Sequence, residues 1–346
     1  MAEISRLRFV RSSLNFARDD KDVELEIIME TRHKTVLLEE AVDNLNLKNG
    51  SVVVDATLGG GGHSLRILRK ILPNGKLIAI DRDEAAIERF KEKIAKENLD
   101  IKKENLILVN DNFANVKNIL ADLDVENADA VLADFGLSSD QLDDNERGFS
   151  FNSDSRLDMR MDRNQELSAY EVVNNYSEEE LRKIIREFGE EKFAGRIAKN
   201  IVEARKNKKI EKVSELVEII LASVPEKFKH QKIHPATRTM QAIRIEVNQE
   251  LESIEKFVRN ATEILSLGGR LAVISFHSGE DRLVKNIFRD LAIACVCPPE
   301  FPVCRCGRKA QIKIISKKPI VASEEEVKEN PRARSAKMRV AEKVIE

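Results

Sequence analysis

The chain of 346 residues lacks the features that mark membrane and secreted proteins. No apolar run approaches the roughly 20 residues that a membrane-spanning helix needs. The first 31 residues contain several acidic side chains and no apolar central stretch, so we expect no signal peptide. Cysteine is scarce: the chain has four, all within residues 295–306. This clustering excludes a disulfide framework spread over a secreted fold, and we expect a cytoplasmic protein.

A strong net charge is also missing. The chain holds 58 Lys and Arg against 60 Asp and Glu, a formal charge of -2, which excludes a polycation. Basic residues instead gather in residues 192–238 and 303–343, each with 12 Lys and Arg against 5 Asp and Glu. Two such segments fit a local phosphate-binding surface. A solvated lysine-rich face fits the same composition.

Short apolar runs alternate with helical patterns up to Gly136. The runs rich in apolar and β-branched residues predict strands at residues 51–55, 75–83, 105–113 and 128–136. Helical spacing occupies residues 35–47, 65–72 and 85–97. Strands that alternate with helices in this way predict a parallel, doubly wound α/β sheet.

After Gly136 the alternation stops. The next segments are a polar, turn-rich stretch, a stretch that looks helical throughout and a long amphipathic stretch, at residues 140–165, 168–222 and 239–266. Strand patterns return at residues 268–276, 312–320 and 338–345. We therefore predict one α/β domain formed by residues 32–139 and 250–346, a mostly helical insertion at residues 140–249, and a weakly structured extension at residues 1–31.

The glycine cluster at residues 59–62 follows the first predicted strand. A phosphate-binding P-loop would end in Gly-Lys-Ser/Thr, whereas this cluster continues Gly62-His63-Ser64. The dinucleotide pattern G-x-G-x-x-G also fails, because its sixth position is occupied by Ser64 or Leu65. Asp81 ends the second strand and can accept both hydroxyls of a ribose. The combination suits S-adenosylmethionine, while the glycines alone fit a tight turn without a ligand.

Long sequence motifs now connect the chain to a known family. It resembles the ribosomal small-subunit RNA cytosine-N4 methyltransferase family, known as RsmH or MraW, over about residues 33–343. The motifs are HKTVLLEEAV, DATLGGGGHS, AIDRD, DFGLSSDQLDDNERGFSF, LDMRMD, FGEEKFAGRIAKNIVEAR, HPATRTMQAIRIEVN, GGRLAVISFHS and NPRARSAKMRVAE. The chain departs from the family at Asp140, where proline is usual, and at Gly279, where leucine is usual.

The resemblance implies a class I, Rossmann-like methyltransferase sheet with an inserted helical substrate domain. It also implies methyl transfer from S-adenosylmethionine to the N4 amine of a decoding-site cytosine in 16S ribosomal RNA of the small subunit. A methyltransferase acting on another nucleic-acid or protein amine would have the same sheet. A non-catalytic RNA-binding protein on the same scaffold is a further alternative, but it predicts loss of the glycine turn, Asp81 or Asp134, all of which are intact.

The resemblance also assigns residues to the cofactor site. They are Gly61, Gly62, His63, Asp81, Phe113, Asp134 and Gln141. We expect the glycine amides and His63 to meet the methionine carboxylate, Asp81 the ribose, and Phe113 an apolar flank. Asp134 is also the catalytic candidate, as the hydrogen-bond acceptor for the target amine. A role confined to holding the cofactor remains the alternative for Asp134.

The RNA contacts are expected in the insertion and in the second basic segment. The candidates are His234, Arg238, Arg244, Arg332, Arg334, Lys337 and Arg339. Arg238 and Arg244 lie in an amphipathic stretch in which an arginine can pack inward, so we expect the removal of at least one of them to destabilise the fold. His234 fits equally well as a hydrogen-bonded core histidine.

The four cysteines, Cys295, Cys297, Cys304 and Cys306, form two Cys-x-Cys pairs six residues apart. Four thiolates so close together predict a structural zinc site. Four reduced thiols in a surface hairpin are the alternative. The sequence leaves the oligomeric state open between monomer and dimer.

Overall fold

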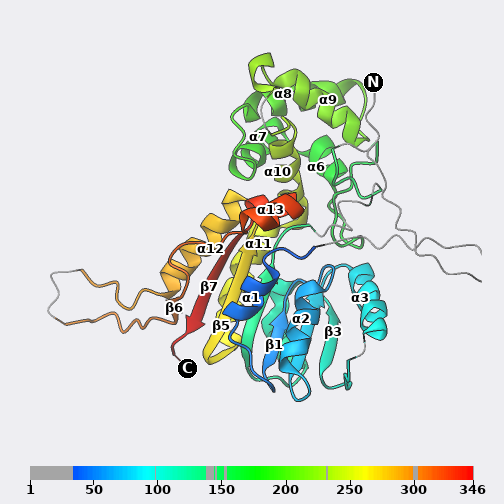
Figure 1. The fold of residues 1–346 in the computed structure, drawn as a ribbon. Helices are drawn as coiled ribbons and strands as arrows, with labels where there is room; N and C mark the ends of the chain where they lie inside the picture. Colours follow the sequence, from blue (N-terminus) through cyan, green and yellow to red (C-terminus); the bar gives the residue numbers. More distant parts are fainter. Residues whose placement is uncertain are drawn as a thin grey trace, which may run out of the picture. The chain divides into compact units, whose positions relative to one another are not determined.

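The computed structural model describes residues 34–97, 99–137, 144, 146–151, 154–230, 233–298 and 303–345; the predicted extension at residues 1–31 lies outside them. A seven-stranded sheet has the order β3-β2-β1-β4-β5-β7-β6 (Figure 1). Neighbouring strands from β3 to β5 are parallel, and β7 is antiparallel to β5 and β6. The strands are β1 Val52–Asp55, β2 Lys76–Asp81, β3 Leu106–Asn110, β4 Ala128–Asp134, β5 Leu265–Ser275, β6 Ile312–Ile314 and β7 Lys337–Lys343.

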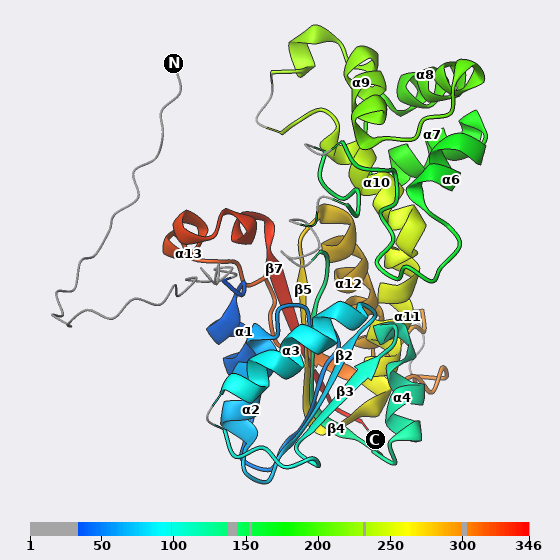
Figure 2. The same cartoon turned by 90° about the vertical axis from the view of Figure 1, so that its right-hand side faces the viewer.

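Helices cover both faces of this sheet, as Figure 2 shows with the strands nearly edge-on. Successive strand residues alternate between the faces, so Val53 packs into one core and Val54 into the other. One face is covered by α1 Leu38–Asn44, α2 Gly62–Ile71 and α3 Glu84–Lys96. The other is covered by α4 Val116–Asp122, α11 Glu250–Ile264 and α12 Ser278–Leu291. This arrangement confirms the predicted doubly wound, class I α/β fold.

Within the described part of the chain between β4 and β5, five helices share an apolar core of their own. They are α6 Ala169–Asn175, α7 Glu178–Glu187, α8 Ala194–Asn207, α9 Val213–Ser223 and α10 Thr237–Asn248. The expectation of helix throughout residues 168–222 is wrong in detail, because caps divide the segment. Ser177, for example, starts α7 through a capping box, with its hydroxyl accepting from the Glu180 amide and its own amide donating to the Glu180 carboxylate.

The amphipathic stretch expected at residues 239–266 is also two helices. Gln249 adopts a left-handed conformation (φ 49°), which ends α10 and begins α11. Ile243 of α10 packs into the core of the insertion, whereas Phe257 of α11 packs against the sheet. The hydrophobic pattern runs through the junction because both helices are amphipathic, and it does not reveal that they serve different cores.

The end of the chain departs from its predicted strands as well. The strand expected at residues 312–320 is only β6, and Ile320 makes a single bridge to Met338 of β7. A short helix, α13 Glu324–Glu329, and a 3-10 turn, η3 Pro331–Ser335, precede β7. The buried Ala333 packs the turn against the same core as α1 and α2.

A buried ion pair fastens the insertion to the sheet domain, and buried hydrogen bonds hold parts of the insertion to one another. Arg147 donates to the Asp83 carboxylate at the start of α3 (2.7 Å) and to the carbonyl of Met161 (2.7 Å). Asn248, the last residue of α10, accepts from the Met161 amide (2.8 Å) and donates to the Met159 carbonyl (2.8 Å). Since these groups are buried, each bond would leave a polar group unsatisfied if it broke.

The turn between β1 and α2 is closed by a buried aspartate. Asp55 is inaccessible to solvent, and its carboxylate accepts from the Ser64 hydroxyl (2.6 Å) and the Thr57 amide (3.2 Å). Burial raises the pKa of Asp55 to about 7, although these two hydrogen bonds oppose the shift. Asp55 therefore ties the end of β1 to the first turn of α2 and fixes the path of the glycines between them.

The raised pKa predicts a pH-dependent contribution of Asp55 to stability. Between about pH 4 and 7 the folded state holds a proton that the unfolded state has released, so the free energy of unfolding decreases as the pH rises. In Asp55→Asn this contribution is absent. We expect the stability difference between wild type and variant to fall by up to about 1.4 kcal/mol per pH unit across that window and to level off above it.

Chemical denaturation at a series of pH values measures this difference. Glu104→Gln, an exposed substitution, is the matched control and should show no such slope. A constant difference between Asp55→Asn and wild type from pH 4 to 8 would mean that Asp55 has an ordinary pKa in the folded protein.

Candidate active site

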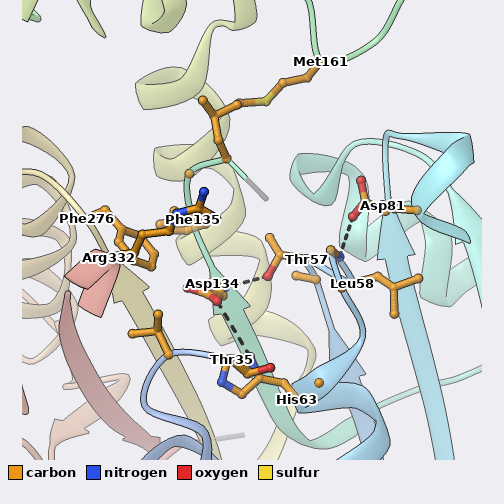
Figure 3. Close-up of a pocket in the computed structure, with 18 of the residues that line it drawn as sticks. Thr35, Thr57, Leu58, His63, Asp81, Asp134, Phe135, Met161, Phe276 and Arg332 are labelled. Atoms are coloured by element: carbon orange, nitrogen blue, oxygen red, sulfur yellow. Dashed lines mark hydrogen bonds and ion pairs between the residues drawn. The ribbon is translucent and has the colours of Figure 1, made fainter. Parts of the chain in front are cut away.

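The carboxyl ends of β1, β2 and β4 meet at one edge of the sheet, where a cavity of about 370 Å³ opens. Ligands of doubly wound α/β proteins bind at this edge. The strand ends and the glycine turn line one side of the cavity. Phe276 after β5 and Arg332 of η3 line the other side (Figure 3). Gln241 of α10 also lines the cavity, so the insertion and the C-terminal segment both contribute to it.

Two positions of the turn require glycine because neighbouring side chains leave no room for a Cβ atom. Gly61 is the N-cap of α2 with a left-handed backbone (φ 70°), and a Cβ there would overlap the Phe90 ring. A Cβ on Gly62 would overlap Thr35. Gly61 has no side chain to cap α2, and both glycines line the cavity. The amino end of α2, with its partial positive charge, therefore suits an anionic group in the cavity.

Asp81 lies at the end of β2 and lines the same cavity. Its carboxylate accepts from the Gly59 amide through Oδ2 (2.8 Å) and from the Asp83 amide through Oδ1 (2.9 Å). These bonds fix the side chain, and each oxygen retains a lone pair for a further donor. Burial raises the pKa of Asp81, and the two backbone hydrogen bonds oppose that shift.

Asp134, the last residue of β4, lies between the glycine turn and the far wall (Figure 3). Its amide donates to Thr57 Oγ1 (2.6 Å), and its Oδ2 lies 3.8 Å from His63 Nδ1. Its Oδ1 has no hydrogen-bond partner among the residues that the structure describes. A buried carboxylate oxygen without a partner is costly, so this atom is suited to receive a donor from a ligand.

The surroundings of Asp134 disfavour its negative charge. Burial raises the pKa of its carboxyl well above the usual range, and the nearby carboxyls of Asp55 and Glu280 raise it further. A positive charge or an N–H donor placed in the cavity would favour the ionised form. The site is therefore electrostatically matched to a cationic or hydrogen-bond-donating ligand.

An aromatic cluster forms the apolar part of the site. The ring of Phe113, just after β3, lies 5.4 Å from the rings of Phe135 and Phe257. The Arg82 guanidinium lies 5.8 Å above the Phe113 ring. Phe113 is thus held from two sides, and it presents an apolar surface to the cavity beside Asp81.

A buried ionic pair supports the far wall. Arg244 of α10 makes two parallel hydrogen bonds of 2.8 Å with Glu250, the first residue of α11. Of the two arginines expected in the amphipathic stretch, Arg244 is thus the one that packs inward, although it also lines the cavity. Its guanidinium binds Glu250 and does not face outward.

The remaining RNA candidates lie in different surroundings. Arg332 lines the cavity, Arg334 is exposed on η3, and Lys337 lies 3.8 Å from Asp281, which also binds Arg339 (2.6 Å). His234 stacks on Phe151 with ring centroids 4.7 Å apart and accepts from the Ala236 amide. His234 and the exposed Arg238 line a second cavity of about 220 Å³ on the insertion.

Six of the seven predicted cofactor residues line the main cavity: Gly61, Gly62, His63, Asp81, Phe113 and Asp134. The seventh, Gln141, lies outside the described residues. The four cysteines lie between α12 and β6 and are not among the described residues that line this cavity.

Several lining residues were not predicted. Thr35, Thr57, Gln241, Phe276 and Asn330 line the cavity and come from five separate segments of the chain. Each lies in one of the long motifs, but the motifs give no physical reason to choose these positions within them. Only the packing of α10, η3 and the β5–α12 connection around the strand ends brings them together.

Comparison with known proteins agrees with this geometry. Residues 30–344 match the profile of the MraW methylase family. A protein of Clostridium botulinum (strain 657 / Type Ba4) named ribosomal RNA small subunit methyltransferase H is 52% identical over 317 residues, which are 91% of this chain and all of that protein. Proteins with the same name from Clostridioides difficile (strain 630) and Brevibacillus brevis are each 50% identical, over 91% and 90% of this chain and 100% and 98% of theirs. The chain therefore belongs to the MraW methylase family.

Proposed function

We propose that this protein transfers a methyl group from S-adenosylmethionine to the exocyclic N4 amine of a cytosine in 16S ribosomal RNA, position 1402 in the standard numbering. The observation that carries the proposal is Asp134 Oδ1, which has no hydrogen-bond partner in the described part of the chain, at the cavity of an MraW methylase. That atom is a buried acceptor, and an amine bound to an aromatic ring is a donor of the matching kind.

The residues of the cavity fit S-adenosylmethionine. The first turn of α2, at Gly61 and Gly62, would receive the methionine carboxylate. The remaining lone pairs of Asp81 would receive the ribose hydroxyls, and Phe113 would flank the adenine. The cofactor supplies an electrophilic methyl group on a sulfonium. The positive charge of the sulfonium would favour the ionised form of Asp134, which burial and the neighbouring carboxyls otherwise disfavour.

Asp134 serves the reaction by orienting the amine. The lone pair of a cytosine amine is delocalised into the ring, which makes the nitrogen a poor nucleophile. A hydrogen bond to Asp134 Oδ1 favours the geometry in which the lone pair is available, and the same oxygen can receive the departing proton. Thr57, which accepts from the Asp134 amide, keeps the end of β4 in place during this step.

The target base has to be unpaired or flipped to enter a cavity of this kind. Gln241 and Arg332 also line the cavity and would face the base and its phosphate. Arg334 and Arg238, both exposed, would contact the RNA backbone farther out. The small ribosomal subunit is the proposed partner, in the cytoplasm. A methyltransferase for another amine would share the cofactor side and differ in these contacts.

We propose no part for the four cysteines in methyl transfer. They are absent from the described lining of the cavity, and four protein thiolates around a metal would leave no open position for a substrate.

Asp81→Ala should weaken the binding of S-adenosylmethionine by about 1–3 kcal/mol, because it removes hydrogen bonds to a charged acceptor. Isothermal titration calorimetry measures the affinity. Glu84→Gln, three residues farther along and exposed, is the control and should bind as wild type. Unchanged affinity in Asp81→Ala, with unchanged thermal unfolding, would remove Asp81 from the site.

Asp134→Asn should lower the single-turnover rate of methyl transfer at saturating cofactor by about 10²-fold or more while RNA binding stays near wild type. Because the pKa of Asp134 is raised, the wild-type rate should increase with pH as the carboxyl ionises, and the variant should lack this increase. Tritiated methyl transfer to small subunits that lack the mark measures both.

Asp124→Asn is the matched control for Asp134→Asn, since Asp124 is exposed and asparagine tolerates its left-handed backbone. A near wild-type rate for Asp134→Asn would leave Asp134 with a role in cofactor binding only. Normal cofactor binding without transfer to ribosomal RNA by the wild type would instead point to another amine substrate.

RNA affinity should fall steeply with salt, because each neutralised phosphate releases condensed counterions. Replacing Arg332 and Arg334 together with alanine should weaken binding without changing cofactor affinity. The slope of log affinity against log salt should become shallower by about 0.7–0.9 for each phosphate that the variant no longer neutralises. A filter-binding titration with a ribosomal RNA fragment or subunit measures the slope.

Lys102 and Lys103 provide the control for this titration, since both are exposed near the amino end of β3, opposite the cavity edge. Their replacement should leave the slope unchanged. Arg244→Ala should behave differently and lower thermal stability, because it leaves Glu250 buried without its partner. A wild-type slope in the Arg332 and Arg334 double variant would confine the RNA surface to the insertion.

A further inference from the structure

The four cysteines converge outside the active site. They lie between α12 and β6, in residues 292–298 and 303–311, which extend away from the sheet in Figure 1 and are called here the cysteine arm. Cys295 Sγ lies 3.4 Å from Cys304 Sγ and 3.8 Å from Cys306 Sγ, and Cys304 Sγ lies 3.5 Å from Cys306 Sγ. All four sulfur atoms, including that of Cys297, are within 4.8 Å of one another.

These separations are close to those of a tetrahedron of thiolate ligands. Zinc–thiolate bonds of about 2.3 Å in tetrahedral geometry place the sulfur atoms about 3.8 Å apart. Disulfides would instead bring the sulfurs together as two separate pairs, each about 2.05 Å apart. Here Cys295 approaches both Cys304 and Cys306 rather than one partner. We infer that the cysteine arm binds one Zn²⁺ through Cys295, Cys297, Cys304 and Cys306.

Backbone amides are arranged to support these ligands. The Cys297 amide donates to Cys295 Sγ (3.4 Å), and the Arg305 amide donates to Cys297 Sγ (3.3 Å). Hydrogen bonds of this kind orient metal-binding thiolates and compensate part of their negative charge. They also show that the two Cys-x-Cys pairs fold toward each other across the arm, since Arg305 lies between Cys304 and Cys306.

The described residues of the cysteine arm form no apolar core that could hold it together. None of its described residues, 292–298 and 303–311, is buried, and Val296 and Val303 are 55% and 70% exposed. Hydrogen bonds fasten the arm at its base, where the Gln311 amide donates to the Leu291 carbonyl (2.8 Å) and Arg308 binds Asp290 (2.7 Å). A segment without a core needs a cross-link to keep one conformation, and a bound metal supplies it.

The site is structural. Four protein thiolates complete the tetrahedron, so the metal retains no position for water or substrate. Its loss should therefore loosen the cysteine arm and leave the cofactor cavity intact.

Metal content of the full-length protein tests the inference. The protein is purified under reducing, anaerobic conditions without added metal or chelator, and zinc is measured by inductively coupled plasma mass spectrometry. We expect about one zinc per chain in wild type and in Val303→Ser, a control in the same arm, and loss of nearly all of it in Cys304→Ser. Zinc retained by Cys304→Ser at the wild-type level would overturn the assignment.

A second measurement uses the wild-type protein, so its outcome does not depend on whether a cysteine variant folds. Wild type stripped of metal and loaded with Co²⁺ should give the intense visible bands and thiolate-to-metal charge transfer of tetrahedral cobalt thiolate. Stripping should also speed proteolysis within the cysteine arm and leave affinity for S-adenosylmethionine unchanged. Metal-free protein with four free thiols or two disulfides, and no such cobalt spectrum, would refute the site without affecting the proposed methyl transfer.

Discussion

The buried hydrogen bond between Asp55 and Ser64 is the constraint on which the rest of the cavity depends. It joins the end of β1 to the first turn of α2 and leaves the chain between them one short path. That path lets the Gly59 amide reach Asp81 and brings His63 close to Asp134. By fixing this path, the Asp55 carboxylate brings the residues at the ends of β1, β2 and β4 together in one site.

Much of this arrangement could be predicted because it follows from local rules. Buried strands of a parallel sheet are continuous apolar runs, and their carboxyl ends share an edge, so Asp81 and Asp134 had to lie near each other. The glycine turn, the class I sheet implied by the family resemblance and the helical character of the insertion come from the same level of information. These features depend on residues close together in the chain or on motifs that occur as unbroken strings.

What could not be predicted depends on tertiary partners. Arg244 and Glu250 are six residues apart, yet their pairing requires the left-handed backbone at Gln249. Glycine is the residue that usually marks this conformation in a sequence, and it is absent at this position. Arg332 reaches the cavity only because β7 inserts between β5 and β6 and brings η3 to the strand ends. The number of basic residues in a segment likewise does not show which of them can bind phosphate. Arg339, for example, pairs with the carboxylate of Asp281.

The attachment of the insertion has a mechanical consequence. Gln249 would be a natural hinge between α10 and α11, but the buried ion pair of Arg147 with Asp83 ties the insertion to the sheet domain. The pair of Arg244 with Glu250 also spans the junction itself. Rotation about this hinge would separate the buried Asp83 carboxylate from Arg147, at a cost on the order of 3 kcal/mol. We therefore expect the helical insertion to keep its place against the strand ends, so that a target nucleotide would have to move into the cavity.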